Sequence, residues 1–328
     1  MRACGSTTRT PSWAASRCRT TASVRRPATR LDQGRHNVPV PERNPFDPVA
    51  DAQAHRLIAR IDALSAHHDA LHGGLRVRWR RFGEGPPLVL LHGGHGSWMH
   101  WLRNIEALAA AHTLWLPDMP GFNDSDTPPR PAPRQDALEP SLDALAATLD
   151  SLVGAGTEID LGGFSFGGLV AAKFALRRGG IRRLALVGSG GHATMRRMKV
   201  DMVNWRAAEN RDKERVALLH NLGALMLHEP AAIDALAFAI HDASCHGTRF
   251  RSKQISTAGG LQAALDALGG AQLLVWGEHD VTADSRPLVA QLVAGHPQRE
   301  GVVVDGAGHW VQYERAAEVN ALLLRYFS

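Results

Sequence analysis

The chain of 328 residues carries a formal charge of +5 and is long enough for one large domain with an insertion or for two smaller domains. The positive charge lies in residues 1–45, where nine Arg stand against one Asp and one Glu, so residues 46–328 carry a net charge of −2. A nucleic-acid partner requires a basic face on the folded part, so this charge distribution argues against nucleic-acid binding.

Residues 1–45 are predicted to be a basic, disordered tail. Their Arg-rich, Ser/Thr-rich composition is also typical of an organelle transit peptide, which stays open as an alternative. No apolar run reaches the roughly 18 residues of a membrane span, and the N-terminus lacks the apolar stretch of a secretory signal. Cys4 and Cys18 lie in the tail and Cys245 stands alone in the body, without disulfide or metal-ligand spacing. We therefore expect a cytoplasmic protein with no membrane partner.

The first predicted elements lead to a glycine-rich loop. Apolar residues recur at helical spacing between residues 47 and 67, and apolar and Arg residues alternate over 75–82, which predicts an amphipathic helix followed by an antiparallel edge strand. Residues 88–91 are a continuous apolar run, typical of a central parallel strand. The loop after it reads His-Gly-Gly-His-Gly-Ser-Trp over residues 92–98. Its two histidines have no third ligand at metal spacing, so no metal site is predicted.

The next elements alternate between helix and strand. Residues 98–111 are predicted to be a helix and residues 113–116 a strand. The strand runs into residues 117–126, whose aspartates are expected to be structural turn residues. A Pro-rich loop at 127–134 precedes a predicted helix over 140–153.

Residues 163–167 read Gly-Phe-Ser-Phe-Gly and end a short predicted strand at 158–164. Gly-x-Ser-x-Gly matches a nucleophile elbow, in which a serine stands on a turn too tight for side chains at the flanking positions. For these five residues alone, an ordinary glycine turn is the alternative. The apolar helical face over residues 169–176 completes the order strand, turn, helix, which favours the elbow and Ser165 as nucleophile.

After the elbow the pattern changes. Residues 184–187 predict another buried strand, with no carboxylate at its end. From about residue 192 to 256 the chain reads as helical segments without strand patterns, near 200–209, 212–227 and 230–241.

Two late strands end in polar motifs. Residues 272–276 run into Gly-Glu-His-Asp, which places Asp280 just past the carboxyl end of a strand, where a carboxylate can orient an imidazole. Glu278 is the alternative acid. Residues 302–304 run into Asp-Gly-Ala-Gly-His-Trp, in which His309 opens the last predicted helix.

Five of these segments, in this order, resemble the α/β-hydrolase superfamily over residues 75–328. The resemblance implies one α/β domain over residues 46–328, with a mostly parallel eight-stranded sheet and helices on both faces. It also makes residues 192–256 a helical cap. Apolar cavity walls are expected from the cap side chains Met202, Trp205, Leu225, Met226 and Phe238.

The resemblance also implies roles for single residues. Ser165 would be the nucleophile, His309 the general base and then acid, and Asp280 the group that orients the imidazole. The backbone N–H groups of Gly94 and Phe166 would form the oxyanion hole. No cofactor or metal is required, and a small-molecule substrate is the expected partner; a homodimer stays open.

A serine at position 165 argues against epoxide hydrolases and haloalkane dehalogenases, which use an aspartate there. Hydrolysis of a small carboxylic ester is the expected reaction. Hydrolysis of a carbon–carbon bond in ring-cleavage dienoates is the alternative, because the Gly-His-Trp segment resembles that branch and an arginine near the end of the cap could pair with a carboxylate. A ligand receptor or scaffold is the non-enzymatic alternative. The expected substrate contacts are Trp98, Trp310, Arg249 and Arg251, although a solvated cap surface is the alternative for the two arginines.

Overall fold

The structure, a computed structural model, describes residues 41–328 apart from 43 and 132–134. Residues 1–40 and 43 of the predicted tail therefore lie outside the described residues. The last residue of the tail, Pro45, is buried. The next residue, Phe46, packs edge-on against Phe238 with ring centroids 5.0 Å apart.

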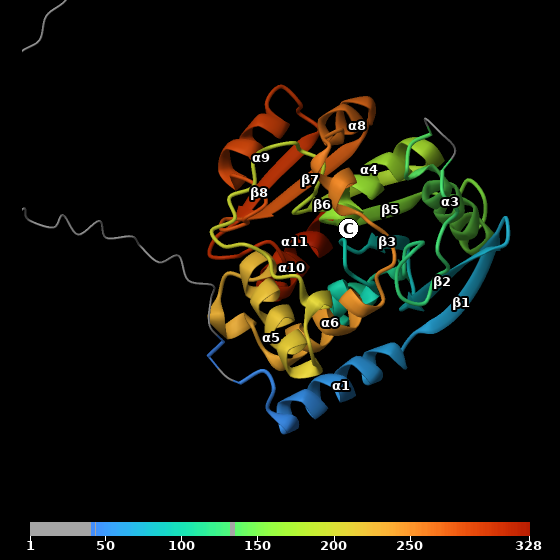
Figure 1. The fold of residues 1–328 in the computed structure, drawn as a ribbon. Coiled ribbons are helices and arrows are strands. Elements are labelled where there is room, and N and C mark those ends of the chain that lie inside the picture. The colour runs from blue at the N-terminus through green and yellow to red at the C-terminus, as the bar shows by residue number, and fades with distance from the viewer. Residues whose placement is uncertain (1–40, 43, 132–134) are drawn as a thin grey trace, which may run out of the picture. The chain divides into compact units, whose positions relative to one another are not determined.

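The described residues form an eight-stranded sheet in the order β1-β2-β4-β3-β5-β6-β7-β8 (Figure 1). The pairs β1–β2 and β2–β4 are antiparallel and all other pairs are parallel, which confirms the predicted mostly parallel sheet. The strands are β1 (Ala66–His72), β2 (Leu75–Phe82), β3 (Pro87–Leu91), β4 (Thr113–Pro117), β5 (Ile159–Phe164), β6 (Ile181–Val187), β7 (Ala271–Gly277) and β8 (Arg299–Val304).

Helices cover both faces of this sheet (Figure 1). Leu88 and Leu90 of β3 pack in one hydrophobic core, with side chains of α2, α10 and α11, whereas Val89 and Leu91 pack in the other, with α3, α4, α8 and α9. This alternation explains the continuous apolar run, because both faces of a central strand are buried. These helices are α2 (Leu102–Ala109), α3 (Glu139–Val153), α4 (Phe166–Arg178), α8 (Leu261–Ala267), α9 (Ser285–Val293), α10 (Val311–Glu314) and α11 (Ala316–Phe327).

The leading helix is shorter than predicted. α1 (Pro48–Asp62) begins after the N-cap Asp47, whose side chain accepts hydrogen bonds from two backbone N–H groups of the first turn. The helical spacing predicts a helix up to residue 67, but residues from Ala66 belong to the edge strand β1. In β1 only Ala70 is buried, so the apolar alternation that identifies most strands is missing.

The segment between β6 and β7 contains no strand among its residues, all of which the structure describes. Before α8 it holds α5 (Arg211–Asn221), α6 (Ala235–His246) and α7 (Lys253–Thr257), and a π-helical turn, Leu222–Met226, continues α5. The predicted helix at 200–209 is wrong: only the 3₁₀ turn Trp205–Ala207 forms there. None of the helices in the described part of the chain has the length and hydropathy needed to span a bilayer.

Candidate active site

Ser165 stands on a sharp turn between β5 and α4, with φ 55° and ψ −119°. Few side chains adopt this backbone conformation, so the surrounding packing must hold it. Neither flanking position has room for a side chain. A Cβ on Gly163 would lie 2.3 Å from the carbonyl oxygen of Gly167, and a Cβ on Gly167 would lie 2.2 Å from the carbonyl oxygen of His92. The turn therefore has the geometry predicted from its five residues.

A chain of hydrogen bonds links Ser165 to a histidine and a carboxylate from two other loops. Nε2 of His309 lies 2.9 Å from Oγ of Ser165, and Nδ1 of His309 lies 2.8 Å from Oδ2 of Asp280. His309 follows β8 and Asp280 follows β7, so parallel strands bring the three side chains to the same edge of the sheet.

Asp280 is the carboxylate beside the histidine, and Glu278 is not. Burial alone would raise the pKa of Asp280, but the imidazole of His309 and hydrogen bonds from Thr282 hold this pKa below its usual value. Glu278 instead accepts hydrogen bonds from Arg286 and from the backbone N–H of Gly306, both at 3.0 Å.

Gly94 and Phe166, the residues expected to form an oxyanion hole, are neighbours beside Ser165. Phe166 is the first residue of α4, so its N–H is one of those that a helix leaves without an intrahelical acceptor. A Cβ on Gly94 would lie 3.5 Å from the Cβ of Phe166, and both residues line the same cavity as Ser165.

Two buried histidines hold the loop that carries Gly94. Nε2 of His92 accepts a hydrogen bond from the N–H of Met119 at 3.0 Å, so its Nδ1 donates to the carbonyl oxygen of Gly93 at 2.8 Å. His100 accepts a hydrogen bond from the N–H of Gly93 through Nδ1 at 3.1 Å. Burial lowers the pKa of His92 to about 4, so at neutral pH its imidazole is uncharged. Both nitrogens of His92 are thus used within the protein, in keeping with a structural role.

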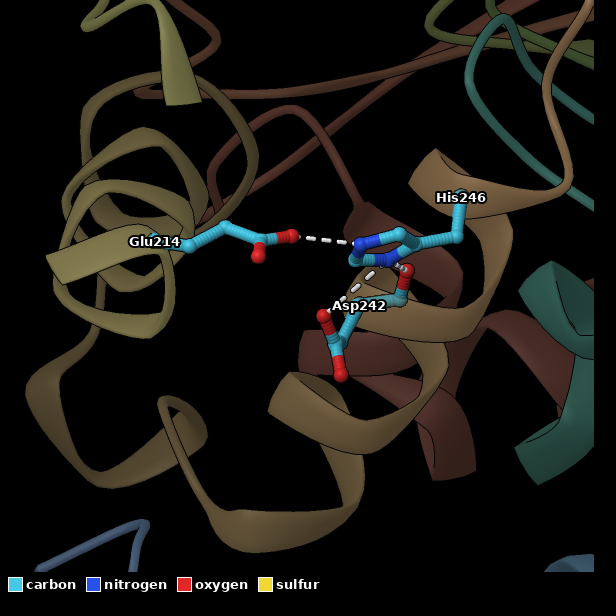
Figure 2. Close-up of side chains that lie close together, drawn as sticks. All are labelled: Glu214, Asp242 and His246. Carbon is cyan, nitrogen blue, oxygen red and sulfur yellow. Dashed lines mark hydrogen bonds and ion pairs between the residues drawn. The ribbon is translucent and has the colours of Figure 1, made fainter. Parts of the chain in front are cut away.

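Glu214, Asp242 and His246 come together between α5 and α6 (Figure 2). Figure 2 shows the two carboxylates at different ring nitrogens: Glu214 lies at Nε2 and Asp242 lies 3.3 Å from Nδ1. Arg211 also pairs with both carboxylates, so an ion-pair network joins α5 and α6 here.

A cavity of about 240 Å³ opens at Ser165 and His309. Its walls include the predicted apolar cap residues Met202, Leu225 and Met226. A second cavity of about 220 Å³ shares these three residues and reaches Trp205, His241 and Cys245. The fifth predicted wall residue, Phe238, is instead buried in the core with Phe46.

The structure does not place the four predicted substrate contacts at this cavity. Trp98 is buried beneath the guanidinium of Arg80, whose central carbon lies 4.8 Å from its ring centroid. Trp310 is fully buried, and its indole N–H donates to the carbonyl oxygen of His100 at 2.9 Å. Arg249 donates to Thr127 and to the carbonyl oxygens of three other residues, and Arg251 is exposed away from the cavity lining.

The cationic side chains that do line the cavity are Arg196 and Lys253. Arg196 lies in the irregular segment after β6, and Lys253 is the first residue of α7. The sequence offers no local signal for either residue, because their position depends on how the irregular part of the cap folds back over Ser165. Among the residues that line the cavity there is no Asp or Glu.

Comparisons with known proteins agree with this fold. A model of the alpha/beta hydrolase family matches residues 88–322. The chain is 30% identical over 266 residues to 2-hydroxymuconate semialdehyde hydrolase of Pseudomonas sp. (strain CF600), covering 78% of this chain and 91% of that protein. It is 45% identical to soluble epoxide hydrolase of Corynebacterium sp. (strain C12), but only over 62 residues, which are 19% of this chain and 22% of that protein.

Among solved structures, naproxen esterase from Bacillus subtilis has the same fold, with a TM-score of 0.67 at 20% identity over 85% of this chain and 98% of that one. These three proteins carry the names of hydrolases or esterases. Because the family model covers most of the chain, including the strands that lead to Ser165 and Asp280 and the loop of His309, this protein belongs to the alpha/beta hydrolase family.

Proposed function

We propose that this protein is a serine hydrolase that cleaves small carboxylic esters through an acyl-enzyme intermediate. The observation that carries the proposal is the continuous hydrogen-bonded chain from Ser165 Oγ through His309 to Asp280, which opens into a mainly apolar cavity. A serine hydroxyl is a weak nucleophile on its own, and a base within hydrogen-bond distance activates it.

The distances support a two-step mechanism. Ser165 Oγ attacks the ester carbonyl carbon while Nε2 of His309 takes its proton, and Asp280 stabilises the imidazolium. The tetrahedral intermediate then expels the alcohol, which receives that proton, and an acyl ester of Ser165 remains. A water molecule repeats the sequence on the acyl-enzyme and releases the carboxylic acid. The N–H groups of Gly94 and Phe166 would hold the negative oxygen in both steps.

The first test is labelling by a fluorophosphonate probe, which reacts with activated serines. We expect wild-type protein to be labelled and Ser165→Ala to be unlabelled. Ser165→Ala and His309→Ala should each lower turnover by about four to six orders of magnitude, and the double variant should be hardly worse, because such residues act as a unit. Wild-type protein that stays unlabelled while binding small ligands would favour a receptor or scaffold instead.

The carboxylate is tested by a matched pair. Asp280→Asn should lower turnover by about three to four orders of magnitude through the wrong imidazole tautomer. Glu278→Gln is the control, because its carboxylate faces Arg286 and Gly306, and it should retain nearly full turnover. The reverse pattern would mean that the acid is misassigned.

A carbon–carbon bond hydrolase of ring-cleavage dienoates is the second candidate. Arg196 and Lys253 line the cavity together with Ser165, and the cavity lining has no acidic residue, an arrangement that favours a substrate with a carboxylate. The likeness to a 2-hydroxymuconate semialdehyde hydrolase points the same way. Arg249 and Arg251, the arginines that suggested this alternative from the sequence, do not line the cavity.

A comparison of two substrates separates the candidates. Arg196→Gln and Lys253→Gln should raise KM for a dienoate carboxylate by about five- to tenfold, the effect of losing a partly exposed ion pair of about 1 kcal/mol, and leave KM for a neutral ester unchanged. Arg251→Gln is the control because it lies outside the cavity lining. If KM changes equally for the two substrates in both cavity variants, a neutral ester remains the better substrate assignment.

A further inference from the structure

We infer that the hydroxyl of Ser252, which the cap supplies, is a third hydrogen-bond donor to the oxyanion, beside the N–H groups of Gly94 and Phe166. This inference rests on the proposed serine-hydrolase function and adds a catalytic residue to it.

The first observation is the position of the hydroxyl. Ser252 is 3% exposed and lines the cavity together with Ser165 and His309. A Cβ on Gly94 would lie 2.4 Å from Oγ of Ser252 and 3.5 Å from the Cβ of Phe166. The hydroxyl therefore occupies the space into which a side chain at Gly94 would project, and the Cβ of Phe166 borders the same space.

The second observation is that this hydroxyl has no hydrogen-bond partner among the described residues, although Ser252 precedes α7 and could cap it. Other groups use the backbone of Ser252 instead: its carbonyl oxygen accepts from the N–H of Ser256 at 2.9 Å and from the hydroxyl of Ser256 at 3.0 Å. Although most of the residue is buried, Oγ of Ser252 is not one of the fully enclosed polar atoms that lack a partner, so it is open to the cavity and free to donate to an oxygen of a bound substrate.

The third observation is that the chain before Ser252 is fixed against the segment after β4 and against Phe166. The N–H groups of Arg249 and Phe250 both donate to the carbonyl oxygen of Gly121, at 2.9 and 3.1 Å. The ring of Phe250 packs against that of Phe166 with centroids 5.7 Å apart. These contacts hold the end of the cap against a residue of the proposed oxyanion hole, so the backbone that carries Ser252 is positioned before substrate binds.

The hydroxyl of Ser252 is expected to stabilise the transition state more than the bound substrate. The carbonyl oxygen of a bound ester is neutral, and it becomes an oxyanion when Ser165 attacks. A hydroxyl donor gains more from the charged oxygen than from the neutral one, so Ser252 should act mainly on kcat and little on KM. The hydroxyl keeps its proton throughout, and no bond to Ser252 forms or breaks.

The chain offers a matched control for the test. Ser252 and Ser256 lie one helical turn apart and line the same cavity, but the hydroxyl of Ser256 already donates to a carbonyl oxygen. We expect Ser252→Ala to lower kcat on a short neutral ester by about 10- to 100-fold with KM within about threefold of wild type, and the loss of kcat in Ser256→Ala to be at least about fivefold smaller than that in Ser252→Ala. Ser252→Gly also lacks the hydroxyl and should reproduce the loss if the alanine variant folds poorly.

Inhibition by a trifluoromethyl ketone distinguishes an oxyanion donor from a residue with a merely structural role. This compound adds to Ser165 and forms a stable oxyanion, so its inhibition constant should weaken in Ser252→Ala by the same factor as kcat/KM falls. Unchanged kcat in both Ser252 variants, or equal losses in Ser252→Ala and Ser256→Ala, would overturn the inference. Failure of the proposed function is distinguishable, because fluorophosphonate labelling of wild type but not of Ser165→Ala tests it without reference to Ser252.

Discussion

Thr282 donates two hydrogen bonds to one oxygen of Asp280: its backbone N–H lies 2.8 Å from Oδ1 and its hydroxyl lies 2.7 Å from the same atom. The other oxygen, Oδ2, is thereby left for Nδ1 of His309 at 2.8 Å. The carboxylate cannot rotate without breaking one of these bonds. Thr282 thus fixes the direction in which Asp280 presents its free oxygen to the imidazole.

Replacing Thr282 by Val tests this positioning. The variant keeps the backbone donor and the shape of the side chain but loses the hydroxyl, so Asp280 should be less well oriented and kcat should fall by about tenfold, with little change in KM. Thr282→Ser is the control, since it keeps the hydroxyl and loses only a methyl group. Steady-state kinetics on one ester suffice, and a larger loss in the serine variant than in the valine variant would contradict the positioning role.

The elbow makes a sharper prediction, at Gly167. A Cβ there would lie 2.2 Å from the carbonyl oxygen of His92, so Gly167→Ala must displace the loop after β3 or the start of α4. Either shift moves a proposed oxyanion donor relative to Ser165. We expect turnover to fall by at least about a hundredfold.

Gly269→Ala is the matched control for this substitution, because a Cβ on Gly269 meets no atom within 4 Å. Its turnover and its unfolding midpoint should stay close to those of wild type. If Gly167→Ala retained the same activity as Gly269→Ala, the packing around the elbow would be looser than the contacts with His92 require.

These local constraints explain why the elbow could be predicted from the sequence. Its geometry depends on Gly163, Ser165 and Gly167 and on the strand and helix that adjoin them, and all of these lie within about twenty residues. The parallel strands could be predicted for the same reason, because burial on both faces leaves a continuous apolar run. The edge strand Ala66–His72 could not, since solvent covers most of its side chains and their polarity follows no period.

The substrate contacts could not be predicted, for a different reason. The sequence places Arg249, Arg251 and Lys253 close together, and only the conformation of the chain at the end of the cap decides which side chain faces Ser165. In the structure Lys253 lines the cavity, whereas the guanidinium of Arg249 is held by the loop around Ser125. In an irregular segment the directions of successive side chains follow no fixed period, so the sequence pattern does not show which of them faces the cavity.

Arg249 is therefore expected to affect the stability of the fold and not the preference for a charged substrate over a neutral one. Its guanidinium donates to Thr127 Oγ1 at 3.0 Å and to the carbonyl oxygens of Asn123 at 2.9 Å and Gly247 at 3.2 Å. Arg249→Lys cannot reach all these acceptors, because an ammonium group lacks the fork of the guanidinium. We expect a loss of about 1 kcal/mol in the free energy of unfolding, or about 2–4 °C in melting temperature.

Arg251→Lys serves as the comparison, since Arg251 is exposed and should leave the melting temperature unchanged. KM values for a charged and a neutral substrate should change in parallel in Arg249→Lys, if they change. A selective rise in KM for the carboxylate substrate would show that Arg249 contacts substrate after all.

Buried neutral histidines should make the protein sensitive to mild acid. Burial lowers the pKa of both His92 and His241 to about 4, whereas the unfolded chain protonates histidine near pH 6.5. As the pH falls from 7 toward 4, the unfolded state binds protons that the folded state does not, so stability decreases over this window. At a cost of about 1.4 kcal/mol per pKa unit, each histidine should remove about 2 kcal/mol from the free energy of unfolding at pH 5.

His241→Gln isolates one of these contributions, because within the described part of the chain the imidazole of the buried His241 has only the sulfur of Cys245 as a hydrogen-bond partner, and His241 lies outside the proposed catalytic group. Urea unfolding at pH 7 and pH 5 should show that the variant loses about 2 kcal/mol less than wild type between the two pH values, whatever its stability at pH 7. His55→Gln is the control, since the side chain of His55 is 63% exposed on α1, and it should follow the wild-type pH dependence. Identical losses in wild type and His241→Gln would mean that His241 binds a proton in the folded protein as readily as in the unfolded chain.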